Sequence, residues 1–158
     1  MIYAFIGMSL VFVAIGFIVT DKNAKYILSG YNTMNEEDRK KVDIKAYIPY
    51  FRNFHIFLGI SFLVLGIGLT YFFSENAGGI FLAVYPIIAY IYFIITSSKY
   101  SKGLSNKWDK IGLIILAGAL LLIVVELRSD FKENKITFDS ESISFEGSYG
   151  EILNKSNV

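Results

Sequence analysis

The sequence contains no cysteine, one histidine and two prolines among its 158 residues. Without cysteine the chain cannot form disulfides, thiolate zinc sites or iron–sulfur clusters, and it has no thiol nucleophile. His55 alone cannot build a histidine metal site. Charge is scarce, at 18% of residues, whereas soluble domains carry about 25%. The net charge of +1 creates no field that attracts nucleic acid. We therefore expect no metal or other cofactor and no nucleic-acid partner.

The residue patterns of several common enzyme sites are missing as well. The chain has no H-E-x-x-H zinc-protease motif, no G-K-[ST] phosphate loop and no G-x-S-x-G nucleophile elbow. Paired carboxylates, which ion-coupled transporters often keep inside the membrane, do not occur within its apolar runs. We therefore predict that the protein is not an enzyme.

Long apolar runs are the main feature that is present. Four stretches together contain a single charged residue, Glu126: residues 1–20, 54–73, 77–98 and 111–127. A helix that crosses the hydrocarbon core of a bilayer needs about 20 apolar residues. The sequence therefore predicts an all-α membrane protein with four transmembrane helices, at about 1–20, 54–73, 77–98 and 108–127.

The first stretch has the length of a signal peptide, but it lacks a basic start and a small-residue cleavage site. We interpret it as a retained span. The transmembrane domain is then predicted at 1–127, with a cytoplasmic loop at 21–53, and a small tail follows at 128–158.

Basic residues indicate the orientation of these spans. Seven lie in 21–53, four lie in 99–110, and four lie in the tail from residue 128. Lysine and arginine collect on the cytoplasmic side of membrane proteins. We therefore expect the N-terminus and the tail outside and both basic loops in the cytoplasm, because the opposite orientation places only the four tail residues inside.

The cytoplasmic loop is predicted to contain a short surface helix. Asn35 is a good N-cap, because three acidic residues follow it in the positive first turn. This helix is expected to have about ten residues and to end at Pro49 at the latest. Before it, the first helix is expected to continue to Ser29, where Gly30 supplies a left-handed stop.

One string in this loop is specific enough to suggest a family. Residues 24–34 read A-K-Y-I-L-S-G-Y-N-T-M, and Glu36, Glu37 and Asp43 follow. The string resembles the signature of a bacterial family of small integral membrane proteins, the domain-of-unknown-function family 3784, over roughly residues 1–96. Members have an aromatic residue just before the aspartate, where this chain has Val42. The resemblance implies a bacterial origin, hence the cytoplasmic (inner) membrane, and this architecture, but no activity.

Gly30, Tyr31, Asn32, Thr33 and Met34 form a predicted corner between two helices. Asn32 or Thr33 would satisfy free amides of the next helix, and Tyr31 and Met34 would pack on the side that faces the membrane. Two roles remain open for the corner. It is a site for lipid headgroups or a partner protein, or it only fixes two helices, which is the commoner role.

Several residues inside the spans are further candidates. Pro86 removes a backbone hydrogen bond and is expected to kink the third span. Glu126 is the candidate intramembrane polar residue, although its place near a span end favours the outer interface. Small residues recur at packing spacings, which either marks close helix packing or reflects the general frequency of glycine in membrane helices: Gly59 and Gly66, Gly79 and Ala83, and Gly112 and Gly118 with Ala117 and Ala119. His55 is expected to be an interfacial aromatic.

The tail differs in composition from the spans. Residues 136–138 and 143–145 alternate between apolar and polar side chains, and residues 139–141 between them have turn chemistry. We predict a small β-hairpin or meander. Residues 143–150 also resemble the first strands of bacterial pleckstrin-homology-like domains, so the tail is expected to be a shortened domain of that kind or part of a longer one.

Two classes of function fit these features. The first is a non-catalytic interaction, accessory or protective (immunity-like) membrane protein with a partner in the envelope. The alternative is a small oligomeric channel or transporter subunit, which would need polar residues along its spans. The expected partners are the lipid bilayer and either an envelope protein or further copies of the chain.

Overall fold

The protein is mostly helical. The computed structural model describes residues 1–28, 30–101, 107–130, 135–138, 142–146 and 151–154. Within these residues, three helices are long and apolar enough to cross a membrane: Ile44–Phe72, Glu75–Tyr100 and Asp109–Leu127. The chain divides into two units, Met1–Gly118 and Ala119–Val158.

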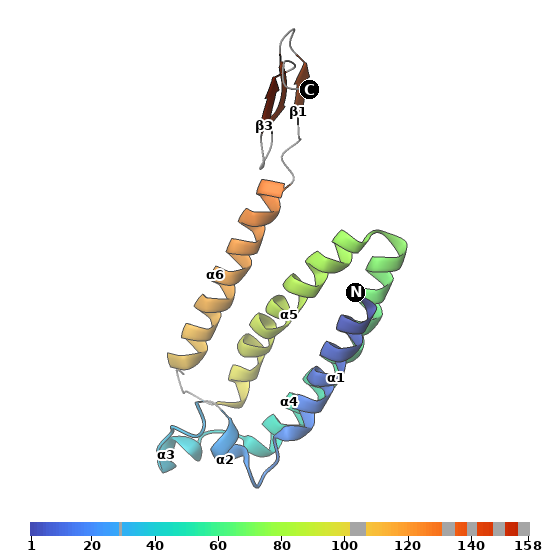
Figure 1. Ribbon diagram of the computed structural model, residues 1–158. Coiled ribbons are helices and arrows are strands. Elements are labelled where there is room, and N and C mark those ends of the chain that lie inside the picture. The colour runs from blue at the N-terminus through green and yellow to red at the C-terminus, as the bar shows by residue number, and fades with distance from the viewer. Residues whose placement is uncertain (29, 102–106, 131–134, 139–141, 147–150, 155–158) are drawn as a thin grey trace. The chain divides into compact units, whose positions relative to one another are not determined.

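In the first unit, three helices lie side by side (Figure 1). The elements of this unit are α1 (Ile2–Ile18), α2 (Ala24–Ile27), α3 (Glu36–Arg39), α4 (Ile44–Phe72), α5 (Glu75–Ser97), the 3-10 turn η1 (Ser98–Tyr100) and the beginning of α6 (Lys107–Asp130). A tight turn joins α4 to α5, because the side chain of Ser74 caps α5 and accepts a hydrogen bond from the backbone N–H of Ala77 (3.1 Å). The helix α4 contacts both α1 and α5, and the ring centroids of Phe5 and Phe12 in α1 also lie 6.4 Å from those of Phe81 and Tyr90 in α5, respectively.

Small residues bring α1 and α4 close together, and the buried rings of Phe5 and Phe12 in α1 pack beside them against Phe62 in α4. A Cβ added at Gly59 would lie 2.6 Å from Cγ2 of Val13 and 2.8 Å from the carbonyl oxygen of Ser9. The Ser9 hydroxyl donates a hydrogen bond to the Gly59 carbonyl oxygen (2.8 Å). A Cβ added at Gly66 would likewise lie too close to a neighbour, Cε1 of the buried Phe5 ring. Of the two interpretations left open for the small residues, close helix packing therefore applies to Gly59 and Gly66. It does not apply to Gly118, where a Cβ would have no atom within 4 Å among the described contacts.

Aromatic rings form the contact between α4 and α5. Phe93 of α5 stacks on Tyr50 of α4, with 5.7 Å between ring centroids and 7° between ring planes. The centroid of Phe93 is also 4.6 Å from that of Phe54. Farther along the same interface, the hydroxyl oxygens of Ser61 and Tyr85 are 2.6 Å apart and share a hydrogen bond. The α4–α5 contact is thus made by side chains, not by close backbones.

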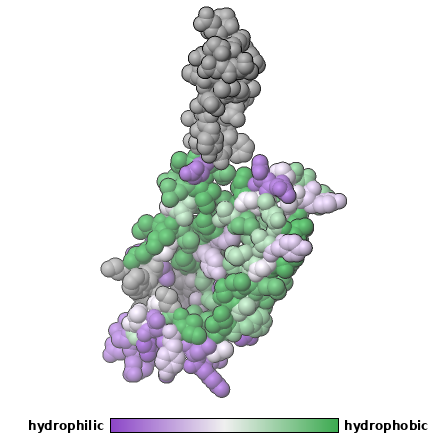
Figure 2. Space-filling model, in the orientation of Figure 1, coloured by the Kyte–Doolittle hydropathy of each residue, from purple (hydrophilic) through white to green (hydrophobic). Residues whose placement is uncertain are grey.

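The outer surface of these helices suits a bilayer. Large apolar side chains such as Ile60, Val64 and Ile95 are more than half exposed. Figure 2 shows apolar residues over the long helices and polar residues at both of their ends, most of them over α2 and α3. Apolar helix surface with polar residues at its ends is the pattern of a membrane protein.

The end of α1 differs from the sequence prediction. The helix ends at Ile18 instead of continuing to Ser29. The side-chain amide of Asn23 donates to the carbonyl oxygen of Ile18 (2.8 Å), and its oxygen accepts from the N–H of Thr20 (2.7 Å). These local side-chain bonds replace helical hydrogen bonds, so the chain turns after Ile18.

The start of α4 also differs from the prediction. The helix begins at Ile44, well before the predicted residue 54, because the Asp43 side chain caps it and accepts from the N–H of Ala46 (3.1 Å). Pro49 lies inside α4, near its start, and does not end a helix. It removes a single backbone donor, and the long apolar helix that follows continues beyond it.

The predicted surface helix is accordingly short. Asn35 is its N-cap, as the sequence predicts, and accepts from the N–H of Asp38 (2.8 Å). The α-helix α3 has only four residues, because the chain must then turn toward the new cap at Asp43. An extended surface helix of about ten residues is therefore not present.

The second unit contains the end of α6 and three short strands. These are β1 (Lys135–Phe138), β2 (Ser142–Glu146) and β3 (Glu151–Asn154), antiparallel in the order β1-β2-β3. Ile136 pairs with Phe145, and Ile143 pairs with Leu153. The segments that join the strands lie outside the described residues, so a folded β-rich tail and its likeness to pleckstrin-homology-like domains stay predictions.

Candidate functional site

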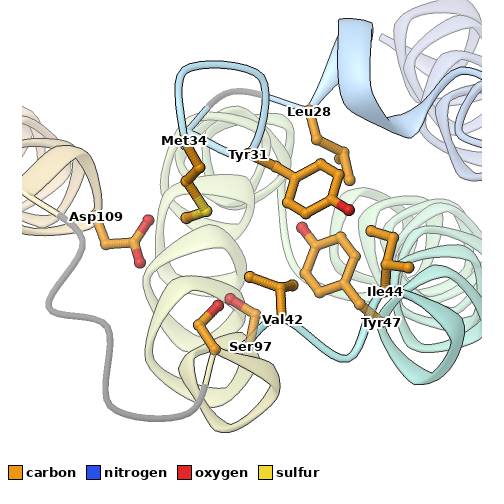
Figure 3. A pocket seen from close by; sticks show the side chains of 9 residues that line it. Leu28, Tyr31, Met34, Val42, Ile44, Tyr47, Ser97 and Asp109 are labelled. Atoms are coloured by element: carbon orange, nitrogen blue, oxygen red, sulfur yellow. The ribbon is translucent and has the colours of Figure 1, made fainter. Parts of the chain in front are cut away.

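A small cavity lies where the predicted corner meets the start of α4, the end of α5 and the start of α6. Its volume is about 60 Å³, and it is lined by Leu28, Tyr31, Met34, Val42, Ile44, Tyr47, Ser97, Ser101 and Asp109. Figure 3 shows that these side chains come from segments far apart in the sequence. Tertiary packing therefore creates the site.

The corner itself is a tight turn. Gly30 has a φ angle of 86°, in the left-handed region that the sequence predicts for it. The N–H of Asn32 donates to the carbonyl oxygen of Leu28 (3.0 Å), and the Thr33 hydroxyl donates to the carbonyl oxygen of Gly30 (3.1 Å). This turn directs Tyr31 and Met34 toward the cavity, while Gly30, Asn32 and Thr33 hold its shape.

Arg39 of α3 fixes the corner from outside. Its Nε donates to the carbonyl oxygen of Tyr31 (3.2 Å), and its Nη2 donates to that of Asn32 (3.0 Å). Its guanidinium carbon also lies 6.0 Å from the centre of the Tyr31 ring. A planar guanidinium can hold two carbonyls at a fixed spacing, so Arg39 makes the corner a defined structure and not a flexible connection.

Backbone contacts attach this loop to the end of α5. The N–H of Asp43 donates to the carbonyl oxygen of Tyr100 (2.9 Å). Val42 and Ser101 form an isolated antiparallel bridge. Lys99, in the same 3-10 turn, lies 4.9 Å from the ring centre of Tyr50 and 5.0 Å from that of Tyr100. These contacts close one side of the cavity.

The polar groups of the side chains that line the cavity all carry oxygen. They are the hydroxyls of Tyr31, Tyr47, Ser97 and Ser101 and the carboxylate of Asp109, which lies in the first turn of α6. No lysine or arginine is among the described residues that line it. In Figure 3 the carboxylate of Asp109 points toward Met34, and the two tyrosine hydroxyls point toward each other. This arrangement favours a positively charged group and does not favour an anion.

Charged residues also form an exposed surface outside the cavity. We call residues 35–41 the surface turn. Nζ of Lys41 lies 2.7 Å from Oδ1 of Asp38, and this hydrogen bond is the main reason why the pKa of the Asp38 carboxyl is lowered. Glu36, Glu37 and Lys40 are exposed. The surface turn is thus ordered by its own cap and ion pair and presents both signs of charge.

The remaining predicted site residues lie elsewhere. Pro86 is inside α5, which continues as a helix on both sides of it, and the predicted kink stays a prediction. Glu126 is exposed on α6, in the second unit. Neither residue lines the cavity.

His55 is buried, contrary to the expectation of an interfacial position. Only 1% of its surface is exposed. Its Nδ1 lies 2.7 Å from the carbonyl oxygen of Phe51, and its Nε2 lies 3.3 Å from the hydroxyl of Tyr90. Both ring nitrogens therefore have partners within the helix bundle. In the described part of the chain, no group of three or more His, Asp or Glu residues could hold a metal ion.

Sequence reasoning missed Asp109, Ser97 and Ser101 as site residues. A signal for Asp109 does exist, because it is the only acidic residue in the lysine-rich segment 99–110, directly before an apolar run. An isolated carboxylate at the edge of a span needs a partner or a function. The two serines carry no comparable signal, since serine is common in such loops.

The chain was compared with models of known protein families. A family model described as a domain of unknown function, DUF3784, matches residues 6–101, which is more than half of the chain. The matched range contains the corner and the cavity lining except Asp109. No curated protein and no solved structure matches the chain.

Proposed function

The chain belongs to the DUF3784 family, and we propose that it is a bacterial inner-membrane protein that acts by interaction. In this proposal it has four transmembrane spans and serves as an accessory or protective, immunity-like protein for a partner in the envelope. It performs no catalysis.

The surface turn is the observation that carries this proposal. A loop that only connects two spans needs no internal structure. Here Asn35 caps α3, Lys41 pairs with Asp38, and Arg39 holds two carbonyl oxygens of the corner. The ordering fixes the backbone from which the exposed side chains of Glu36, Glu37 and Lys40 project. Charges on an ordered backbone support recognition of a partner protein, because less backbone entropy is lost on binding.

The fourth span in the proposal is α1. It has 17 residues, at the lower end of the range of about 17 to 25 that crosses a bilayer. Its contact with α4 through Gly59 and Gly66 supports a common placement in the membrane, because α4 is long enough to span it. The basic residues of 21–53 and 99–110 then favour a cytoplasmic surface turn and an N-terminus outside.

Labelling of single introduced cysteines tests this topology. The chain has no cysteine of its own, so Lys40→Cys and Asn76→Cys each provide one unique thiol at an exposed position. We expect an impermeant maleimide to label Asn76→Cys in intact cells and Lys40→Cys only after permeabilisation. Labelling of both from the same side would contradict the arrangement of α4 and α5 as neighbouring spans.

Co-purification from mild detergent tests the interaction. We expect a stoichiometric partner whose yield falls in the double variant Glu36→Gln and Glu37→Gln, which removes two exposed charges without changing side-chain size. Glu75→Gln is the matched control, because Glu75 is an exposed first-turn acid at the other end of the long helices. Equal partner yields in all three proteins would contradict a role for the surface turn.

A small oligomeric channel or transporter subunit is the alternative. It is favoured by polar side chains between α4 and α5, namely the pair Ser61 and Tyr85 and the pair Tyr50 and Thr96. Both pairs are bonded internally, so a water-filled path would have to separate them. Ion flux into liposomes that contain the purified protein, abolished by Tyr85→Phe, would establish the alternative and reject the interaction role.

A further inference from the structure

We propose that the cavity beneath the corner binds a primary ammonium group on a short carbon arm. This is the chemistry of an ethanolamine phospholipid headgroup and of free ethanolamine. The site is separate from the exposed charges of the surface turn, and it requires only that the cavity lie at the end of the membrane-spanning helices.

The charge of the lining selects a cation. Asp109 contributes a carboxylate, and Tyr31 and Tyr47 contribute hydroxyl oxygens and electron-rich ring faces. A carboxylate offers about four lone-pair sites, so Asp109 can accept from an ammonium group in addition to its contacts within the protein. A primary ammonium can donate three hydrogen bonds to such acceptors.

The size of the cavity selects a small group. A water-sized atom needs about 10 to 15 Å³ of such space, so a cavity of about 60 Å³ accepts a group of about four to six non-hydrogen atoms. The four heavy atoms of an ethanolamine fit this volume. A choline group carries three additional methyl groups on its nitrogen and cannot donate a hydrogen bond, so we expect it to be rejected on both grounds.

The position of the cavity suits a lipid headgroup. It lies among the first residues of α4 and α6 and the last residues of α5, where apolar helices give way to polar loops. The rings of Tyr47, Tyr50 and Tyr100 pack together at the same end of these helices. Tyrosine and tryptophan are enriched at the membrane interface. Lys99, two residues before Ser101 of the lining, lies over two of these rings and provides positive charge for a lipid phosphate.

The test uses the full chain, purified in a detergent whose headgroup is not zwitterionic. Lipid binding is followed by the change in Trp108 fluorescence. This residue is the only tryptophan and directly precedes Asp109 in the sequence. Short-chain phosphatidylethanolamine, its mono- and dimethyl derivatives, phosphatidylcholine and phosphatidylglycerol are added in separate titrations. We expect phosphatidylethanolamine to bind about tenfold or more tightly than phosphatidylcholine, because hydrogen bonds to a charged group are lost on methylation. Equal affinities for the two lipids would overturn the proposal without any variant.

Asp109→Asn keeps the size of the side chain and removes its charge. We expect this variant to lose the preference for phosphatidylethanolamine, whereas Asp38→Asn, on the surface turn, keeps it. Retention of the full preference by Asp109→Asn would also overturn the proposal. If Asp109→Asn does not fold, the methylation series on the unaltered protein still decides the question.

Two further titrations distinguish the source of the ammonium group. Displacement of the lipid by free ethanolamine, but not by choline, would identify the ammonium arm itself as the ligand. If lipid selectivity persists without such displacement and weakens in Lys99→Gln, the ligand is the complete phospholipid headgroup. Both results support the ammonium site. Its failure would leave the partner yield of the surface turn unaffected, so the two proposals fail separately.

Discussion

The two faces of α4 differ in how closely the backbones approach. Toward α1, the backbone of α4 comes so close that a Cβ at Gly59 would lie 2.8 Å from the Ser9 carbonyl oxygen. Toward α5, the contact is made by large rings, among them Phe93, Tyr50 and Phe54. The α1–α4 interface therefore combines close backbones with ring packing, since Phe5 and Phe12 of α1 lie against Phe62 of α4. In the rings cited above, the α4–α5 interface depends on side chains alone.

This difference matters because of the lipid environment. Apolar side chains gain little by leaving lipid for a helix interface, so the strength of a contact comes from close packing and hydrogen bonds. Where two backbones touch, there is no room for an added side chain. Where rings pack, the neighbouring side chains can partly fill the cavity that a lost ring leaves. We therefore expect the α1–α4 interface to be intolerant of added volume and the α4–α5 interface to be moderately tolerant of lost volume.

The largest effect is expected for Gly59→Val. The new side chain would meet Val13 and the Ser9 carbonyl oxygen, and neither backbone can move without separating α1 from α4. We expect a destabilisation of about 3 kcal/mol, at the upper end for overpacking, measured by unfolding of the purified protein in mixed detergent and SDS micelles.

Gly68→Val is the matched control for this prediction. Gly68 lies on the same helix, but a Cβ there has no atom within 4 Å among the contacts that the structure gives. We expect its unfolding midpoint to stay close to that of the unaltered protein. Similar destabilisation by both variants would mean that helix propensity, and not the α1 contact, governs these positions.

A smaller effect is expected for Phe93→Ala, which removes the main ring that α5 places against α4. In soluble cores such a change costs about 3 to 5 kcal/mol. Part of this cost is the transfer of the ring into water, which does not occur in lipid. We therefore expect about 2 kcal/mol in the same unfolding assay.

Phe57→Ala is the control for this experiment, because it removes a phenylalanine ring from the outer surface of α4 and not from a contact between helices. Phe57 lies on α4 but is 69% exposed on the outer surface. Its loss should hardly change the unfolding free energy. If Phe93→Ala exceeds Gly59→Val, the order of the two interfaces is the reverse of our expectation.

The sequence predicts the long apolar helices well and their ends poorly. Hydropathy is a property of many residues, so single exceptions do not disturb it. A helix end depends on one side chain. Asn23 donates to the carbonyl oxygen of Ile18 where α1 ends, and Asp43 accepts from the N–H of Ala46 where α4 begins. Asparagine and aspartate have several possible local partners, and the sequence does not show which one is used.

The candidate site shows the same limit more strongly. Tyr31 and Met34 are named by the corner motif, and Gly30 has the backbone conformation that the motif predicts. Asp109 reaches the cavity from a helix more than seventy residues later. No local sequence pattern links residues so far apart. Asp109 lies near Tyr31 and Met34 because α5 ends, and α6 begins, beside the corner.

Gly30 and Gly59 are required for different reasons, backbone conformation at Gly30 and space at Gly59. The φ of 86° at Gly30 is unfavourable for a side chain. Gly30→Val should cost about 1 to 2 kcal/mol, from the strain of a left-handed conformation. Gly30→Asn should cost clearly less, because asparagine tolerates this region. Unchanged unfolding of Gly30→Val would contradict the tight turn at the corner.

The smallest effect is expected for the hydrogen bond between α4 and α5. The hydroxyl oxygens of Ser61 and Tyr85 are 2.6 Å apart, but Ser61 also donates within its own helix to the carbonyl oxygen of Phe57 (2.6 Å). Ser61→Ala and Tyr85→Phe, alone and combined, form a double-mutant cycle. We expect a coupling energy of about 0.6 kcal/mol, the average for such bonds inside membranes. A coupling above about 1.7 kcal/mol, the largest value seen for such pairs, would show that polar contacts and not rings hold α5 to α4.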